Sequence, residues 1–369
     1  MPLVCSIKKD FGDFALSADF SAEDEKTALL GASGSGKSMT LKCIAGIVKP
    51  DSGHIEVNGK VLFDSASRIN LVPQKRHVGF LFQDYALFPN MTTLKNISLG
   101  VPKAEKANRD KIARQLISSF QLDGLENRFP SQLSGGQRQR CALARILAGN
   151  PEILMLDEPF SALDAFLRWQ LEQELGVMLE SFKKPVLYVS HNRDEVYRLC
   201  EKIVIMDRGV SGKPEKKWEL FENPVTRSAA ILTGCKNISP IRIESGKVEA
   251  ISWGLVFRPS SIPRNAGFLG IRANYILPAA KAENPANYVF FDYEIIREIE
   301  DTFVCILLIK PAGVEAKEPI RWEIRKTDRP ALETQPRKCC VLRSHMMLLA
   351  DSNEEQSDEA SEVRWKNVF

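Results

Sequence analysis

A glycine-rich segment near the start of the chain has the residues and the spacing of a phosphate-binding loop. It reads GASGSGKS from Gly31 to Ser38, after the apolar run TALL and before SMTLKCIAGIV, which has a helical pattern. In a strand–loop–helix unit, backbone N–H groups and the positive end of the helix dipole bind phosphate, and the lysine reaches the β and γ phosphates. The sequence therefore predicts a nucleotide site. Its expected binding residues are Gly31, Ser33, Gly34, Ser35, Gly36, Lys37, Ser38 and Met39.

An apolar segment further along the chain ends in two acidic residues. The run ILML is followed by Asp157 and Glu158. A carboxylate at a strand end can hold Mg²⁺ through water, and its neighbour can orient and polarise an attacking water. Taken alone, each segment also fits a plain alternative: a flexible turn for the glycines and an ordinary strand end for the acids. Together they predict phosphoryl transfer, with Ser38 and Asp157 on Mg²⁺ and with Lys37 and Glu158 in catalysis.

A third segment opens a predicted helix about 20 residues before the acidic pair. It reads Leu133-Ser134-Gly135-Gly136-Gln137 and precedes RQRCALARILA. The free N–H groups and the dipole of a helix N-terminus attract anions, although a capped helix with a flexible entry would contain the same residues. The order of the three segments resembles the ABC ATPase family, whose signature sequence is LSGGQ. The resemblance implies that Ser134, Gly135, Gly136 and Gln137 bind the γ-phosphate of an ATP held by the opposite subunit.

The resemblance extends to single residues outside these segments. It implies that Gln83, in GFLFQDYALFP, is a catalytic residue and an Mg²⁺ ligand, which senses Mg²⁺ and nucleotide and faces a transmembrane partner. Asp164, in SALD, matches the loop that crosses the dimer interface. His191, after PVLYVS, matches a switch histidine on the γ-phosphate, although a lone histidine at a strand end is usually structural. Phe11, in KDFG, resembles the aromatic residue that stacks on adenine, with Phe14 as a close alternative.

The chain carries one set of these segments, so a two-site enzyme requires two copies of it. The expected mechanism is that ATP closes a homodimer, Glu158 activates water, and hydrolysis reopens the dimer. The implied cofactors are ATP and Mg²⁺. The implied partners are a second copy of the chain, transmembrane permease subunits and, indirectly, a solute-binding protein.

An α/β scaffold must position these residues. The alternation of apolar and polar residues in the first 20 positions predicts an antiparallel hairpin, and ILMLDE and PVLYVS predict buried strands of a parallel sheet. Helical periodicity predicts a helical subdomain over about residues 88–150. We therefore expect a P-loop NTPase nucleotide-binding domain over residues 1–233.

The remainder of the chain differs in composition and in the length of its apolar runs. Residues 234–350 contain short runs rich in Val, Ile and Phe, separated by Gly, Pro and Asn, which predict a small all-β accessory or regulatory domain with an OB-like barrel. Residues 351–369 contain six acidic and two basic residues, and their first part, DSNEEQSDEASE, has almost no apolar content. This composition predicts a disordered acidic tail.

Composition narrows the class of protein. The 369 residues carry a formal net charge of +3 without a basic run interleaved with aromatics, so nucleic acid is not an expected partner. The eight cysteines form no CxxC pair, which predicts reduced thiols, with Cys339 and Cys340 as small core residues. No apolar run approaches the roughly 20 residues of a membrane span, and the N-terminal residues are too charged for a signal peptide. We expect a peripheral protein on the cytoplasmic face of the cell membrane.

Within the family, the chain resembles importer ATPases for molybdate and related oxyanions, including sulfate. The resemblance rests on VPQKRHVGFLFQDYALFPNMT, AAILTGCKNISP and GFLGIRANYI. Importers of polyamines and sugars share much of this architecture and remain alternatives. The Ser-Ala-Arg-Asn pattern of molybdate-binding small domains is absent. Oxyanion binding and ATPase inhibition by residues 235–350 is therefore an open question.

Two hypotheses from other classes compete with the importer. A soluble ABC ATPase that moves nucleic acid, chromosomes or ribosomes would carry a long coiled-coil insertion, two catalytic halves or a basic arm, and the sequence has none of these. An oxyanion-binding regulator with a vestigial ATPase is disfavoured by the complete set of motifs, including Glu158 and His191.

Overall fold

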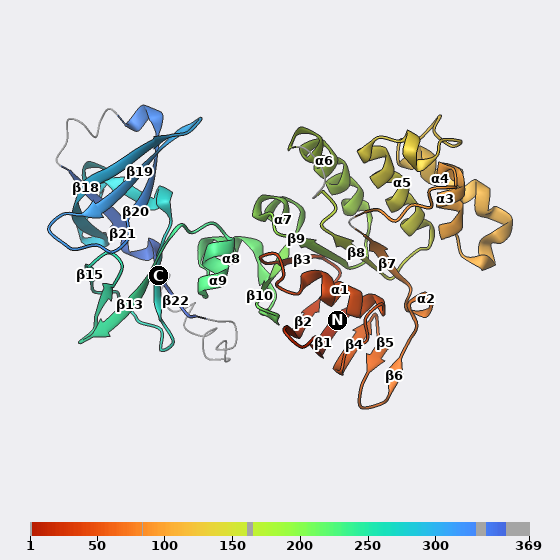
Figure 1. Ribbon diagram of the computed structural model, residues 1–369, viewed down its shortest axis with the longest axis horizontal. Coiled ribbons are helices and arrows are strands. Elements are labelled where there is room, and N and C mark those ends of the chain that lie inside the picture. Colours follow the sequence, from red (N-terminus) through yellow and green to blue (C-terminus); the bar gives the residue numbers. More distant parts are fainter. Residues whose placement is uncertain (1, 83, 161–164, 330–336, 352–369) are drawn as a thin grey trace. The chain divides into compact units, whose positions relative to one another are not determined.

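The computed structural model describes residues 2–82, 84–160, 165–329 and 337–351 (Figure 1). The chain divides into two compact units, the first ending at Lys217 and the second beginning at Trp218. This division falls before the expected boundary at Thr233. The segment before Thr233 belongs to the second unit because Arg272 of that unit binds it. The guanidinium of Arg272 donates hydrogen bonds to the backbone carbonyl groups of Phe221 and Thr233. Within the described residues, no helix has both the length and the apolar character needed to cross a membrane.

One sheet runs through the first unit and contains 12 strands among the described residues. The strand order is β6-β5-β4-β1-β2-β11-β10-β3-β9-β8-β7, and β12 pairs with β10. The strands are β1 (Leu3–Asp10), β2 (Ala15–Ala22), β3 (Lys26–Leu30), β4 (Ser52–Val57), β5 (Lys60–Asp64), β6 (Ile69–Asn70), β7 (Val78–Leu81), β8 (Ile153–Asp157), β9 (Val186–Ser190), β10 (Lys202–Asp207), β11 (Val210–Ser211) and β12 (Glu215–Lys216).

The part of the sheet formed by β10, β3, β9, β8 and β7 is parallel. Strands β8 and β9 are buried along their whole length, as expected for continuous apolar strands in a parallel sheet that is covered on both faces. The side chains of Leu29 in β3, Met155 in β8 and Val189 in β9 belong to one hydrophobic core, and each is 0% exposed. The buried parallel strands predicted for ILMLDE and PVLYVS are therefore confirmed.

The other part of the sheet begins with the N-terminal hairpin. Strands β1 and β2 pair antiparallel, from Leu3 opposite Ala22 to Asp10 opposite Ala15. Their buried and exposed residues largely alternate, because successive side chains of a strand point to opposite faces. The predicted hairpin is confirmed.

Helices of the first unit flank this sheet, and several of them form an insertion between β7 and β8 (Figure 1). In the insertion, α3, α4 and α5 pack against one another, which confirms the predicted helical subdomain. Its entry is fixed by the buried Asn96, whose Nδ2 donates to the carbonyl groups of Phe88 and Met91 at 3.1 and 2.9 Å. The helices are α1 (Lys37–Ala45), α2 (Pro73–Arg76), α3 (Thr93–Gly100), η1 (Lys103–Asn108), α4 (Arg109–Ser119), η2 (Pro130–Gln132), α5 (Gly135–Ala148), α6 (Ala165–Ser181), α7 (Arg193–Leu199) and α8 (Lys217–Glu222), the last of which spans the division.

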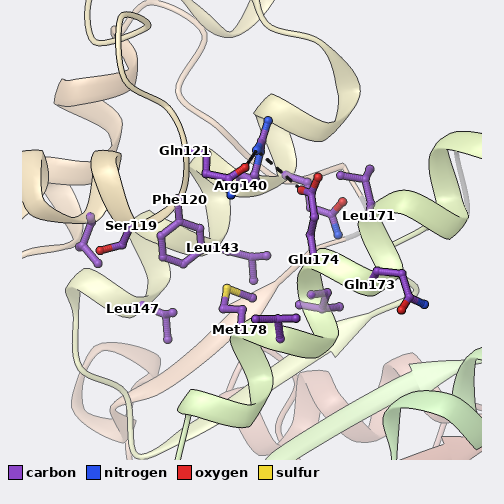
Figure 2. A pocket seen from close by; sticks show the side chains of 14 residues that line it. Ser119, Phe120, Gln121, Arg140, Leu143, Leu147, Leu171, Gln173, Glu174 and Met178 are labelled. Atoms are coloured by element: carbon purple, nitrogen blue, oxygen red, sulfur yellow. Dashed lines mark hydrogen bonds and ion pairs between the residues drawn. The ribbon is translucent and has the colours of Figure 1, made fainter.

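A mainly apolar cavity lies between this insertion and α6 (Figure 2). Its volume is about 690 Å³, and Leu143, Leu147 and Met178 are among its lining residues. At its edge, Arg140 Nη1 lies 3.7 Å from Glu174 Oε2. Apolar atoms that line a cavity lack the packing partners of a filled core. We therefore expect this part of the helix interface to contribute less to the free energy of unfolding than the hydrophobic core that contains Leu29, Met155 and Val189.

The second unit is built from β-strands that follow α9 (Arg227–Leu232). Its described strands form two five-stranded antiparallel sheets, in the orders β15-β14-β13-β16-β22 and β17-β21-β18-β19-β20. Side chains from both sheets share one core, which includes Trp253 and Trp322 at 1% and 0% exposed. This confirms the predicted small all-β, OB-like domain. The strands are β13 (Asn237–Glu244), β14 (Lys247–Ala250), β15 (Leu255–Phe257), β16 (Phe268–Ile271), β17 (Ile276–Pro278), β18 (Tyr288–Glu300), β19 (Val304–Pro311), β20 (Ile320–Arg325), β21 (Lys338–Leu342) and β22 (Met346–Leu349). Short 3-10 helices connect them: η3 (Ala273–Tyr275), η4 (Ala279–Lys281), η5 (Pro285–Asn287), η6 (Lys326–Asp328) and η8 (Arg343–His345).

All eight cysteines are buried and none forms a disulfide. Cys339 and Cys340 lie in β21, each 0% exposed, and burial raises the pKa of both thiols. A raised pKa keeps a thiol protonated and unreactive at neutral pH. The prediction that these two residues are small core residues is confirmed. The expected acidic tail, apart from Asp351, lies outside the described residues.

One histidine of the first unit gives a testable pH dependence. His54 Nδ1 lies 2.9 Å from Asp64 Oδ2, and Nε2 lies 3.3 Å from Glu56 Oε2. The hydrogen bond with Asp64 raises the pKa of His54 above its ordinary value of 6.5. Since the folded pKa is raised, the stabilisation is complete below the unfolded pKa and is lost as pH rises through the folded pKa.

We therefore expect wild type to melt at a higher temperature than His54→Gln at about pH 6, and expect this gap to shrink at about pH 9, where imidazole is neutral. Thermal melting followed by circular dichroism at several pH values measures the gap. A gap that is the same at both ends of this range would mean that protonated His54 contributes nothing to stability.

Candidate functional site

The carboxyl ends of three parallel strands bring the predicted residues to one edge of the sheet. Leu30, which ends β3, pairs with Ser190, which ends β9. Asp157, which ends β8, pairs with Val189 of the same strand β9. The segments that leave these ends are the phosphate-loop segment, the acidic pair and the turn at His191. They therefore lie side by side although they are far apart in sequence.

The glycine-rich segment forms a tight loop around the ammonium group of Lys37. Its Nζ donates to the backbone carbonyl groups of Gly31 and Ala32 at 2.8 and 2.7 Å. Burial lowers the pKa of Lys37, while the charges of Glu158 and Asp157 oppose this effect. A Cβ atom at Gly31 would lie 2.3 Å from the carbonyl oxygen of Met206, so a larger residue cannot occupy this position without moving the backbone.

The remaining loop residues differ in exposure. Ser33 and Gly34 are exposed, whereas Ser35 and Gly36 are buried. Ser35 is 5% exposed, and its hydroxyl has no hydrogen-bond partner among the described residues. Gly36 precedes α1 with a φ of 102° and gives the helix no side-chain cap, so N–H groups of the first turn are available to an anion. The side chain of Met39 packs against the hydrophobic core, which leaves its backbone N–H as its means of contacting a phosphate.

The two predicted metal ligands within the described residues are in contact. Ser38 Oγ donates to Asp157 Oδ1 at 2.8 Å. Burial raises the pKa of Asp157, while the hydrogen bond from Ser38 opposes this effect. A hydroxyl and a carboxylate are the hard oxygen donors that Mg²⁺ takes together with substrate phosphates. The arrangement therefore fits Mg²⁺. Gln83, the third predicted ligand, lies outside the described residues.

Glu158 and His191 form a second pair beside the first. His191 Nδ1 lies 3.1 Å from Glu158 Oε1, and their side chains are 58% and 22% exposed. Glu158 has a φ of 45°, a left-handed conformation that is uncommon for residues other than glycine. Its backbone N–H donates to the carbonyl of Val189 at 3.0 Å, which holds it in this conformation. Strained backbone of this kind is often found at functional sites.

The LSGGQ segment forms the N-terminus of α5. Ser134 is the N-cap residue, and its hydroxyl accepts from the N–H of Gln137 at 3.3 Å, while Gln137 Oε1 accepts from the N–H of Ser134 at 2.9 Å. This reciprocal pair is a capping box, which is the plain alternative considered for this segment. A Cβ at Gly136 would lie 2.8 Å from Leu171 Cδ2 of α6. Gly136 therefore allows close packing of two helices, and Gly135 directly follows the cap.

Phe11 and Phe14 compete for the predicted adenine contact. Their ring centroids are 6.1 Å apart. Phe11 is 38% exposed, whereas Phe14 packs against the hydrophobic core. Lys9 Nζ lies 5.8 Å from the Phe11 ring centroid. Phe11 is thus the ring that is more accessible to a ligand.

Two residues that the sequence analysis missed anchor the segment after Gln83. The hydroxyl of Tyr85 donates to the carbonyl of Pro159 at 3.3 Å, next to Glu158. From α5, Arg145 donates to the carbonyl groups of Tyr85 and Ala86 at 3.0 and 2.7 Å. These contacts are made to backbone atoms and leave no recognisable sequence pattern. Asp164, like Gln83, lies outside the described residues.

Comparison with known proteins identifies a family and several relatives to which this chain is similar. The family model described as "ABC transporter" matches residues 16–161. A sulfate/thiosulfate import ATP-binding protein, CysA, of Bradyrhizobium diazoefficiens is 35% identical over 345 residues, which cover 89% of this chain and 96% of that relative. CysA of Synechocystis is 40% identical over 64% of this chain and 67% of its own length. A molybdenum import ATP-binding protein, ModC, of Paramagnetospirillum magneticum is 38% identical over 55% of this chain and 56% of its own length.

Proposed function

Because the chain belongs to the ABC transporter family of ATP-binding proteins, we propose that it is the ATP-hydrolysing subunit of an importer for sulfate or a related oxyanion such as molybdate. The observation that carries the proposal is the meeting of the Ser38–Asp157 pair, the Glu158–His191 pair and the Lys37 loop at one edge of the sheet. As a member of this family, the protein binds ATP and is an ATPase.

In the proposed reaction, water attacks the γ-phosphorus atom and the bond to the β–γ bridging oxygen breaks, giving ADP and phosphate. Lys37 binds the β and γ phosphates, and Glu158 orients the attacking water and accepts its proton. His191, at hydrogen-bonding distance from Glu158, contacts the γ-phosphate. Ser38, Asp157 and Gln83 would hold Mg²⁺, which neutralises charge on the phosphates when bound. Phe11 stacks on adenine.

The active unit in this proposal is a homodimer. Each chain has one phosphate loop and one LSGGQ segment. The N-terminus of α5, with Ser134, Gly135, Gly136 and Gln137, completes the site of the partner chain by binding its γ-phosphate, and Asp164 crosses the interface. Closure on ATP then makes hydrolysis depend on both chains.

Mixing two inactive variants tests this shared site. Lys37→Ala and Ser134→Arg homodimers are each expected to be inactive. Random exchange of subunits gives heterodimers in which both changes fall in the same site, so the other site is intact. The mixture should recover about a quarter of wild-type ATPase activity, since half of the dimers are mixed and each has one of two sites intact.

The matched control mixes Lys37→Ala with Glu158→Gln. These two changes lie on the same side of the shared site, so every site of the mixed dimer contains one of them and activity stays low. Recovery in both mixtures, or in neither, would contradict the head-to-tail dimer.

The solute is proposed from the relatives named above, with sulfate favoured because CysA of Bradyrhizobium diazoefficiens matches along 96% of its length. Permease subunits supply the membrane path, a solute-binding protein delivers the oxyanion, and this chain is peripheral on the cytoplasmic face. Deletion of the gene should reduce uptake of radiolabelled sulfate or molybdate and leave putrescine and maltose uptake unchanged. Loss of putrescine or maltose uptake instead would assign the chain to a polyamine or sugar importer.

A further inference from the structure

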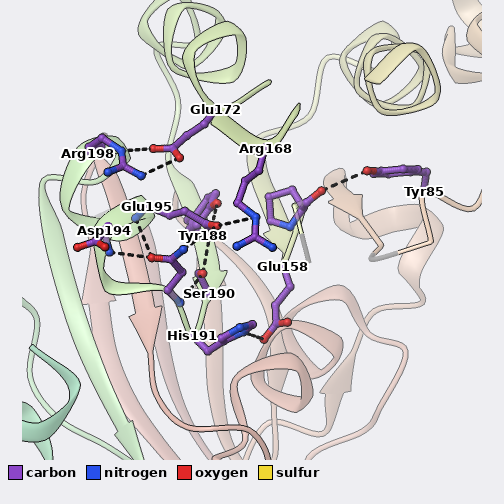
Figure 3. A network of polar contacts seen from close by, with 12 residues as sticks. Tyr85, Glu158, Arg168, Glu172, Tyr188, Ser190, His191, Asp194, Glu195 and Arg198 are labelled. Carbon is purple, nitrogen blue, oxygen red and sulfur yellow. Dashed lines mark hydrogen bonds and ion pairs between the residues drawn. The ribbon is translucent and has the colours of Figure 1, made fainter. Parts of the chain in front are cut away.

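A buried carboxylate lies next to the turn that carries His191 (Figure 3). Glu195 of α7 is 4% exposed. Its Oε2 accepts hydrogen bonds from the hydroxyl groups of Ser190 and Tyr188 at 2.9 and 3.1 Å. Its Oε1 accepts from Asn192 Nδ2 at 3.3 Å. A carboxylate buried to this degree is costly unless it is paired, so its partners define one arrangement of this region.

The partners of Glu195 include the residues on both sides of His191. Ser190 precedes His191 and Asn192 follows it, and Ser190 Oγ also accepts from the N–H of Asn192 at 2.9 Å. Asn192 in turn caps α7, because its Oδ1 accepts from the N–H of Asp194 at 2.9 Å. The backbone of the turn is therefore held at each end by the same carboxylate.

His191 depends on this turn for its orientation. Its side chain is 58% exposed, so packing constrains it little, and its Nδ1 lies 3.1 Å from Glu158 Oε1. A functional side chain keeps its geometry only when neighbouring groups lock it. Here Glu195 constrains the backbone on both sides of His191, because it accepts hydrogen bonds from the side chains of Ser190 and Asn192.

The same carboxylate also reaches the helix that follows the region of Asp164. Glu195 Oε1 lies 3.9 Å from Arg168 Nε of α6. Burial raises the pKa of Glu195, while the hydrogen bonds from Ser190 and Tyr188 and the charge of Arg168 oppose this effect. Glu195 thus contacts β9, the His191 turn and α6.

We propose that Glu195 is a positioning residue for ATP hydrolysis, which holds the Ser190–His191–Asn192 turn so that His191 meets Glu158. This inference rests on the proposed function, in which Glu158 orients the attacking water. Glu195 touches neither ATP nor the water and acts through His191.

The variants Glu195→Ala and Glu195→Gln test the proposal. In Glu195→Ala, kcat should fall by about tenfold to a hundredfold, because a displacement of about 1 Å can cost that much. The KM for ATP should stay within about twofold, since the groups that bind the phosphates are unchanged. Glu195→Gln should lose less activity, because the amide keeps the shape and still accepts from Asn192. If Glu195→Ala does not fold, Ser190→Ala, which removes one of the hydrogen bonds, takes its place.

A matched control is available on the same two helices. Glu172 of α6 is 1% exposed and pairs with Arg198 of α7 through both of its oxygens. Neither residue touches the His191 turn within the described contacts. Glu172→Gln should lower the melting temperature but leave kcat near wild type. A fall of kcat in Glu172→Gln as large as that in Glu195→Ala would reduce Glu195 to a structural residue and overturn the proposal.

A double-mutant cycle closes the test. If Glu195 acts through His191, then Glu195→Ala should have no further effect on the single-turnover rate in a His191→Ala background. An equal loss in both backgrounds, or an unchanged kcat in Glu195→Ala, would overturn the proposal while wild-type hydrolysis stands. A wild-type protein without ATPase activity would overturn the proposed function, and this inference with it.

Discussion

Replacing Glu158 with glutamine is expected to lower kcat for ATP hydrolysis by about 10²- to 10⁴-fold, which is the usual contribution of a group that accepts a proton in the transition state. The amide cannot accept the proton of the attacking water. It keeps the size of the side chain and leaves the Lys37 loop and the Ser38–Asp157 pair intact. ATP should therefore still bind. Phosphate release and equilibrium binding of ATP, measured on the same preparation, separate the two effects.

Glu152 provides the control for this change. It precedes β8 at the opposite end of the strand, where its carboxylate accepts from Asn58 Nδ2 at 2.9 Å and lies 3.5 Å from Lys184 Nζ. Glu152→Gln should hydrolyse ATP at the wild-type rate. Undiminished turnover in Glu158→Gln would remove Glu158 from catalysis. The Glu158→Gln protein should also persist as an ATP-bound dimer, so a strictly monomeric ATP complex would contradict the shared site.

Removing the ammonium group of Lys37 is expected to lower kcat/KM for ATP by at least about a hundredfold, because a positive group aimed at the transferring phosphoryl group is worth roughly that much. Lys37 is 4% exposed and supplies the buried positive charge of the loop. Lys37→Ala also leaves the carbonyl groups of Gly31 and Ala32 without this donor. Both nucleotide affinity and turnover should therefore fall.

The measurement is the concentration dependence of hydrolysis together with binding of a fluorescent ATP analogue. Lys49, an exposed lysine just beyond α1, gives the control: Lys49→Ala should match wild type. Normal ATP affinity and turnover in Lys37→Ala would mean that the glycine-rich segment is only a turn. A melting curve shows whether the variant folds.

Contiguous segments were the part of this protein that sequence could predict well. The loop from Gly31 to Ser38, the strand ending at Asp157 and the helix beginning after Ser134 each carry their signal in a few neighbouring residues. Local patterns of this kind fix a turn, a strand or a helix start, because the backbone conformation depends mainly on adjacent residues. The hairpin, the buried parallel strands, the helical insertion and the β-rich second unit followed from the same local patterns.

Residues that act through backbone atoms were not predictable. Arg145 holds the carbonyl groups of Tyr85 and Ala86, and any residue at those two positions would offer the same carbonyl groups. Glu195 was missed for a different reason: a glutamate on an amphipathic helix is normally a solvated residue. Its burial depends on how α7 packs against β9 and α6.

The sequence by itself determined which chemical groups this protein has: a phosphate loop, an acidic pair, a helix N-terminus and a histidine after a strand. Only the tertiary structure decided which of them meet. Ser38 contacts Asp157 across 119 positions of sequence, and His191 contacts Glu158 across 33. The physical reason is the parallel sheet, in which strands distant in sequence pair in a fixed register and so bring their carboxyl ends to one edge.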